Sequence, residues 1–98
     1  MDGIQVIAEP QRRRILELVW DEEMSAGDIA NEFSITFGAV SQHLGVLRKW
    51  GFVDVRSAGN RRFYRANKEA LGPLRPMLEA MWSDTLEHLA RTIEAEEP

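Results

Sequence analysis

The sequence predicts a mainly α-helical fold with one small β-hairpin (α+β), in a single domain over residues 1–98. Two observations lead to this class. Apolar side chains recur at helical spacing over 10–20, 36–50 and 73–93, whereas 52–66 alternates apolar with charged residues around a turn. A monomer of this length buries only about 60–70% of its unfolded surface, so we expect a second copy to complete the core.

The first third of the chain predicts two helices. Pro10 suits the first position of a helix, because its missing N–H would have no partner there, and we expect this helix to reach about Trp20. Three acidic residues at 21–23 then interrupt the apolar pattern. Ser25 and Asp28 resemble a capping box, which predicts a short second helix.

A third helix is expected over about 36–50, with Thr36 as its N-cap and Gly51 as the left-handed residue that closes it. At 100° per residue, one face gathers apolar side chains, namely Val40, Leu44 and Leu47. The opposite face carries small and polar residues, namely Gly38, Ser41, Gln42, Gly45 and Lys49. One face is therefore expected to pack and the other to stay free.

The hairpin is expected over about 52–66, with strands at 52–56 and 61–65 and a turn at 57–60. Asn67 then suits an N-cap, and Pro73 and Pro76 predict a turn or kink before a long last helix over about 73–93. The apolar residues at both ends of the chain are expected to form a homodimer interface, with these members: Ile4, Ile7, Leu74, Leu78, Met81, Trp82 and Leu89.

Charge is strongly segregated along the chain. The net charge is −4, yet 36–68 carries seven basic residues against one acidic residue, a net of +6, and each flank nets −5. Clustered Lys and Arg displace counterions from nucleic-acid phosphates, so the local balance favours a nucleic-acid partner that the total would disfavour. A solvated basic face is the less specific interpretation.

Other classes of protein find little support. The chain has no cysteine, so we expect no disulfide and no thiolate metal site. It has no apolar run near 20 residues and no cationic leader, so we expect a soluble, cytoplasmic protein without a membrane partner. It also lacks a phosphate-binding glycine loop and a Gly-x-Ser-x-Gly motif, so we expect neither an enzyme nor a cofactor.

Two helices joined by a short turn, with small and polar residues on the second, suit the major groove of DNA. Gln42 can form a bidentate pair with adenine, and Ser41 can bond a base or a phosphate. Gly38 and Gly45 would let the backbone approach closely. Phosphate contacts are expected from Arg48 and Lys49 and from the tip of the hairpin, formed by Asn60, Arg61 and Arg62.

Three segments of the chain carry a specific motif, namely 39–48 (AVSQHLGVLR), 51–53 (GFV) and 59–65 (GNRRFYR). With them, the chain resembles the ArsR-type winged helix-turn-helix repressors over about residues 5–90. The resemblance implies that the third helix reads operator DNA, that the hairpin is the wing and that the terminal helices pair two protomers. The groove-facing positions it implies are Thr36, Phe37, Gly38, Ala39, Ser41, Gln42 and His43.

The chain departs from the family in its metal ligands. Metal-sensing members carry a Glu-Leu-Cys-Val-Cys-Asp-Leu box, and here Ser25 and Gly27 replace both cysteines. Of the ligands that other members use on the last helix, only Asp84 and His88 remain, and an ordinary surface ion pair is the preferred interpretation. A metal-responsive repressor with non-cysteine ligands is thus an alternative. We predict no metal site.

Several roles stay open at this point. His43 fits either a structural hydrogen bond or a phosphate contact, and Phe37 either touches a thymine methyl or packs beside Val40. Arg12–Arg14 either extend the DNA contact or, as we prefer, complement nearby acids. We predict a dimeric repressor of double-stranded DNA with a partly palindromic operator. The alternative is a winged-helix module that binds protein, which the salt dependence of binding would distinguish.

Overall fold

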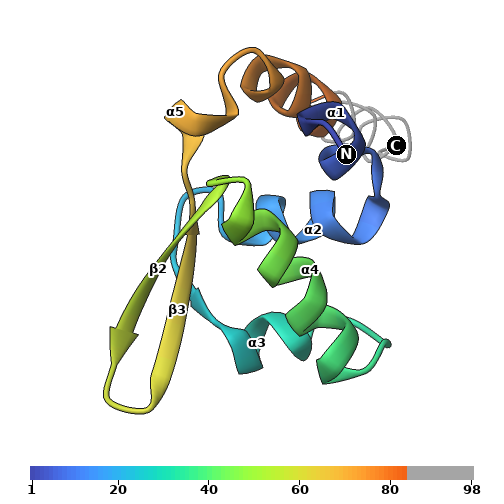
Figure 1. The fold of residues 1–98 in the computed structure, drawn as a ribbon. Coiled ribbons are helices and arrows are strands. Elements are labelled where there is room, and N and C mark those ends of the chain that lie inside the picture. Colours follow the sequence, from blue (N-terminus) through green and yellow to red (C-terminus); the bar gives the residue numbers. More distant parts are fainter. Residues whose placement is uncertain (84–98) are drawn as a thin grey trace, which may run out of the picture.

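The computed structural model describes residues 1–83 (Figure 1). Along the chain the elements are α1 (Gly3–Ala8), α2 (Pro10–Leu18), β1 (Met24–Ser25), α3 (Ala26–Ala30), α4 (Phe37–Lys49), β2 (Val53–Ala58), β3 (Arg61–Ala66) and α5 (Lys68–Leu71). A further helix occupies 74–83. The hairpin of β2 and β3 extends from the helices as an arm, which confirms the predicted fold class.

The two ends of α4 lie where the sequence places them. Thr36 Oγ1 accepts a hydrogen bond from the Ala39 N–H at 3.1 Å, which satisfies one of the free donors of the first turn. At the other end Gly51 has a φ of 75°, and the Phe52 N–H donates to the Leu47 carbonyl at 2.9 Å. This is the Schellman arrangement, and it fixes the direction in which the chain enters the hairpin.

The sheet has three antiparallel strands in the order β1-β3-β2. The β1 strand was not predicted from the sequence; its Met24 pairs with Tyr64 and its Ser25 pairs with Phe63. A two-residue strand is too short to show an alternating pattern, so the omission has a simple cause. This strand attaches the loop that follows α2 to the hairpin.

The hairpin is longer and its turn tighter than predicted. Pairing runs from Val53 opposite Ala66 to Ala58 opposite Arg61, so only Gly59 and Asn60 form the turn. Gly59 has a φ of 62°, in the left-handed region that two-residue turns require and that glycine adopts without strain. The predicted four-residue turn at 57–60 was therefore wrong by two residues.

The core lies between α2, α4, the base of the sheet and the helices at both ends. Its fully buried members are Val6, Ile15, Leu16, Val19, Ile29, Val40, Leu47, Leu71 and Leu78. The α2 helix ends at Leu18 rather than at Trp20, and the carbonyl of its C-cap Val19 accepts a hydrogen bond from the Ala66 N–H at 2.9 Å. The end of α2 is thereby joined to the base of β3.

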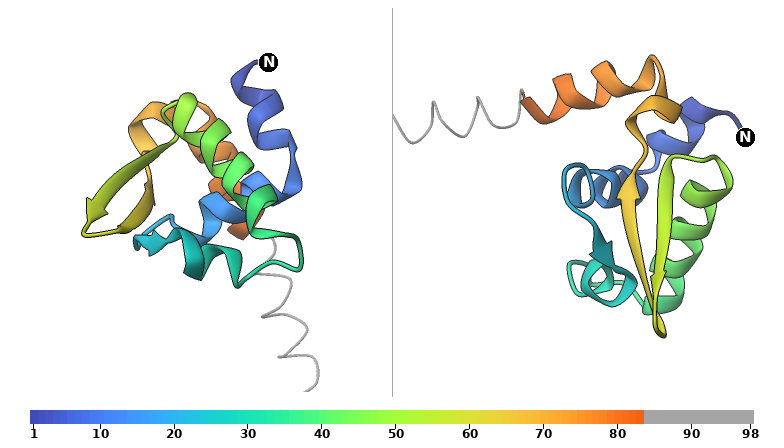
Figure 2. Two further views of the ribbon diagram at one scale, coloured as in Figure 1. Left: turned by 60° about the horizontal axis from the view of Figure 1, so that its bottom comes forward. Right: turned by 90° about the vertical axis from the view of Figure 1, so that its left-hand side faces the viewer.

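The chain after the sheet turns away from the hairpin. Asn67 caps α5 as predicted, accepting a hydrogen bond from the Ala70 N–H, and Gly72 with a φ of 53° ends it. The next helix begins at 74, and its Trp82 packs edge-to-face with Trp20, with 4.8 Å between the ring centres. In the right-hand view of Figure 2 this helix, drawn in orange, lies at the opposite end of the molecule from the hairpin tip. No helix within 1–83 has the length and apolarity to span a bilayer.

Candidate nucleic-acid interface

The α4 helix has one packed face and one free face, as its sequence predicts. Val40, Leu44 and Leu47 are buried. The side chains on the other side are exposed, namely Ser41, Gln42, Arg48 and Lys49, together with the backbone at Gly38 and Gly45. A Cβ added at Gly45 would meet nothing within 4 Å, and one added at Gly38 would meet only Thr36 Oγ1, at 4.0 Å. Packing within the chain therefore does not require glycine at either position.

Phe37 at the start of α4 projects from the surface, with 58% of the residue exposed. It lines an open hollow of about 650 Å³ between α3 and the tip of the hairpin, to which Gly27, Asn31, Asn60, Arg61 and Arg62 also contribute. In Figure 1, α3, the start of α4 and the tip of the hairpin lie at the lower end of the molecule. The start of the predicted reading helix and the tip of the predicted wing thus lie at the same end of the protein.

Acidic residues from the N-terminal flank neutralise part of the basic segment. Glu23 forms a bidentate ion pair with Arg56, and Asp21 lies 2.8 Å from Lys68 Nζ. The hydrogen bond from Arg56 lowers the pKa of Glu23 and raises that of Arg56, and the bond from Lys68 lowers the pKa of Asp21. The net charge of +6 that the sequence gives for 36–68 therefore overstates the free positive charge.

The cations that remain are distributed between α4 and the wing. Among residues 1–83, four members of the basic segment have no acidic partner within 4 Å and no acid opposite them in the sheet, namely Arg48, Lys49, Arg61 and Arg62. Arg65 lies opposite Asp54 in the hairpin register. All four free cations belong to the predicted contact set.

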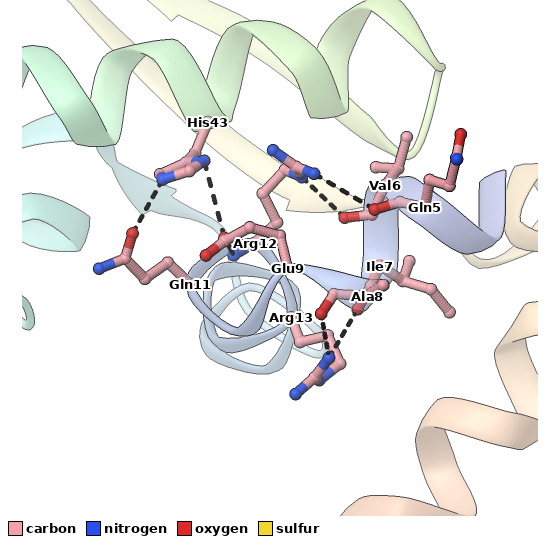
Figure 3. A network of polar contacts seen from close by, with 9 residues as sticks. All are labelled: Gln5, Val6, Ile7, Ala8, Glu9, Gln11, Arg12, Arg13 and His43. Carbon is pink, nitrogen blue, oxygen red and sulfur yellow. Dashed lines mark hydrogen bonds and ion pairs between the residues drawn. The ribbon is translucent and has the colours of Figure 1, made fainter. Parts of the chain in front are cut away.

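His43 does not share the free face of α4. Its Nε2 lies 2.9 Å from Gln11 Oε1 and its Nδ1 lies 3.8 Å from Glu9 Oε2, with 18% of the side chain exposed (Figure 3). Glu9 is also the N-cap of α2 and accepts a hydrogen bond from the Arg12 N–H. The structure thus favours the structural interpretation of His43, which attaches α4 to the start of α2, over the predicted phosphate contact.

The three arginines of α2 have two different roles. Arg14 forms an ion pair with Glu17, in line with the preferred interpretation. Arg12 Nε instead donates to the Val6 carbonyl at 2.7 Å, and Arg13 Nη1 donates to the Ala8 carbonyl at 2.8 Å (Figure 3). Basic side chains commonly satisfy the last carbonyls of a helix, so these two arginines fasten the end of α1 to α2.

The predicted dimer residues lie in different environments. Ile4 and Met81 are exposed, at 61% and 42%, and Leu74 and Trp82 are half-buried. Ile7 and Leu78 are buried in the core of the single chain and have almost no surface left for a partner, which corrects their assignment to the interface. Leu89 lies outside the described residues.

The non-cysteine metal ligands considered from the sequence, Asp84 and His88, also lie outside the described residues. Within 1–83 no three His, Cys, Asp or Glu side chains come close enough together to hold a metal ion.

Comparison with known proteins gives one consistent result. The sequence pattern described as "bacterial regulatory protein, arsR family" matches residues 9–55. The HTH-type transcriptional regulator Rv2034 of Mycobacterium tuberculosis is 35% identical over 94% of this chain and 86% of its own. The transcriptional repressor SdpR of Bacillus subtilis is 34% identical over 68% of this chain and 74% of its own.

A solved structure has the same arrangement of elements. It is the homodimeric winged helix-turn-helix DNA-binding domain Mb0332 of Mycobacterium bovis, described as a possible ArsR-family regulator. The TM-score is 0.70 at 27% identity, covering 88% of this chain and 80% of the other.

Proposed function

The chain belongs to the ArsR family of bacterial regulatory proteins, and from this we propose that it is a sequence-specific DNA-binding repressor that acts as a homodimer. The observation that carries the proposal is the free polar face of α4, whose start lies beside a cationic hairpin tip at one end of the molecule. Such a regulator works on the chromosome, so we infer a cytoplasmic protein.

In the proposed complex α4 enters the major groove. Gln42 reads an adenine edge through its amide, and Ser41 bonds a base or a phosphate. Phe37, being exposed, is free to touch a thymine methyl. Thr36, Gly38 and Ala39 lie where the helix would come closest to the bases, and phosphate contacts come from Arg48, Lys49, Asn60, Arg61 and Arg62.

The proposed dimer forms at the other end of the molecule. A Cβ at Gly3 would meet Leu74 Cδ1 at 3.2 Å, so α1 and the helix from 74 lie against each other. Large apolar side chains remain exposed on both, namely Ile4, Met77 and Met81. A two-fold axis here would present two α4 helices to successive major grooves, about one helical turn apart, and the bound dimer would block polymerase.

In vitro selection of bound DNA, with divalent metal added and withheld, tests the proposal. We expect enrichment of a partly palindromic site, and light scattering should give about twice the chain mass. A protein that enriches no sequence and binds no duplex at low salt would contradict DNA binding and would favour a protein partner. A monomer at micromolar concentration would contradict the dimer. A reporter whose expression rises with the protein would identify an activator.

A further inference from the structure

The side chain of Arg56 on β2 is held from two sides. Its Nη2 donates to Glu23 Oε1 at 2.5 Å, and its Nε lies 3.2 Å from both carboxylate oxygens. Its Cζ lies 4.7 Å from the centre of the Phe63 ring. A bidentate carboxylate with an aromatic ring beside it orients a guanidinium more firmly than a single ion pair does.

Arg56 is also a neighbour of the proposed DNA contacts. The hairpin register pairs Arg56 with Phe63 and Ala58 with Arg61, which places Arg56 and Arg61 on the same face of the hairpin. The Arg61 Cζ lies 5.2 Å from the same Phe63 ring. Two guanidinium groups therefore share one aromatic ring near the hairpin tip, and only Arg56 has an acidic partner among the described residues.

Glu23 comes from a distant part of the chain. It directly precedes Met24, and the pairing of Met24 with Tyr64 brings Glu23 beside the hairpin. This short strand, which adds little to the core, thus positions the carboxylate. Glu23 itself is exposed, so the contact is open to competition from solution.

We propose that the Glu23 carboxylate occupies the position on Arg56 that a DNA phosphate would otherwise take. One cation of the wing is thereby kept from contacting DNA. The inference rests on the proposed DNA-binding function. A phosphate that displaced the carboxylate would leave Glu23 unpaired beside a polyanion, and the exchange would release no net counterion. Glu23 thereby reduces affinity for DNA of any sequence and leaves base reading by α4 unchanged. The ratio of specific to non-specific binding rises as a result.

Replacing Glu23 with glutamine tests this, with Glu22→Gln as the matched control. Glu22 is adjacent and exposed, and no described residue pairs with it, so both variants remove one carboxylate at nearly the same place. Affinity for a random-sequence duplex is measured by fluorescence anisotropy from 50 to 200 mM NaCl. For each bound protomer, Glu23→Gln should steepen the log–log salt dependence by about 0.9, so that affinity falls about 3.5-fold more over this range. Glu22→Gln should keep the wild-type slope.

Two further variants isolate Arg56. Arg56→Gln alone should leave the slope unchanged, because its charge is already engaged, and Arg56→Gln combined with Glu23→Gln should restore the wild-type slope. Circular dichroism and thermal unfolding establish that each variant is folded. Equal slopes for Glu23→Gln and Glu22→Gln, or a lower slope for Arg56→Gln alone, would overturn the inference and leave DNA binding intact. A wild-type protein that binds no duplex at 50 mM NaCl would overturn both.

Discussion

Replacing Arg61 and Arg62 with alanine is expected to halve the salt dependence of DNA binding. Within the basic segment 36–68 of each protomer, four residues have neither an ion pair with an acid among residues 1–83 nor an acid opposite them in the sheet, and two of the four are at the hairpin tip. If each neutralises one phosphate, the dimer has a log–log slope of about −7, and the double variant has a slope of about −3.6.

These slopes correspond to a large difference in measured affinity. Between 50 and 200 mM NaCl the wild-type dimer should lose about 10⁴-fold in affinity and the double variant only about 10²-fold. Fluorescence anisotropy with labelled duplexes, one carrying the selected operator and one a random sequence, measures both. Because phosphate contacts carry no sequence information, the loss should be similar for the two duplexes.

The control removes the same number of charges elsewhere. Arg14 and Arg75 pair with Glu17 and Glu79 within their own helices, and neither belongs to the proposed contact set. Arg14→Ala with Arg75→Ala should therefore keep the wild-type slope. An unchanged slope for the Arg61 and Arg62 variant, or an equal decrease for the control, would refute the assignment of the hairpin tip as the clamp.

Three further predictions follow from other parts of the structure. Gln42→Ala should relax preference at one base pair of each half-site, at a cost of about 1–3 kcal/mol in discrimination, measured with operator variants. Leu78→Ala should lower the free energy of unfolding by about 2–5 kcal/mol in denaturant titrations, because it leaves a cavity in the core. Ile4 is exposed at the proposed dimer interface, so Ile4→Glu should instead yield a monomer in light scattering. The hydrogen bond from Arg56 lowers the pKa of Glu23, so its stabilising effect is complete above the ordinary carboxyl pKa of 4.5 and disappears as the pH falls through the lowered value. Stability measured against pH should therefore fall less steeply on the acid side for Glu23→Gln than for the wild type.

The elements that the sequence predicts well are those fixed by neighbouring residues. The α4 helix has its N-cap at Thr36, its apolar spacing and its stop at Gly51 within one short stretch, and all three were confirmed. The hairpin was predicted for the same reason, through alternation and a glycine turn. Its turn was misjudged because Ser57 and Ala58 suit a turn as well as a strand end, and only the pairing of Ala58 with Arg61 decides between them.

The features that the sequence did not predict depend on contacts between distant residues. Glu23 and Arg56 are 33 residues apart, and His43 and Gln11 are 32 apart. The sequence around Glu23 does not indicate that it pairs with Arg56, and the sequence around His43 does not indicate that it bonds Gln11. The charge totals along the chain were correct, yet the segregation in sequence is only partly kept in space, because Glu23 and Asp21 of the acidic flank pair with Arg56 of the hairpin and Lys68 of α5.

The α2 helix is the element that relates these distant contacts to one another. Its N-cap Glu9 and its residue Gln11 hold His43 on the reading helix, and the loop after its C-terminus holds the wing through Glu23. Arg12 and Arg13 fasten α1, where the proposed dimer forms, to the same helix. The reading helix, the wing and the proposed dimer end are therefore all attached to α2 or to the loop that follows it. The distance between the two α4 helices in a dimer should then depend mainly on how α1 and the helix from 74 pair, because each α4 is fixed relative to its own α2.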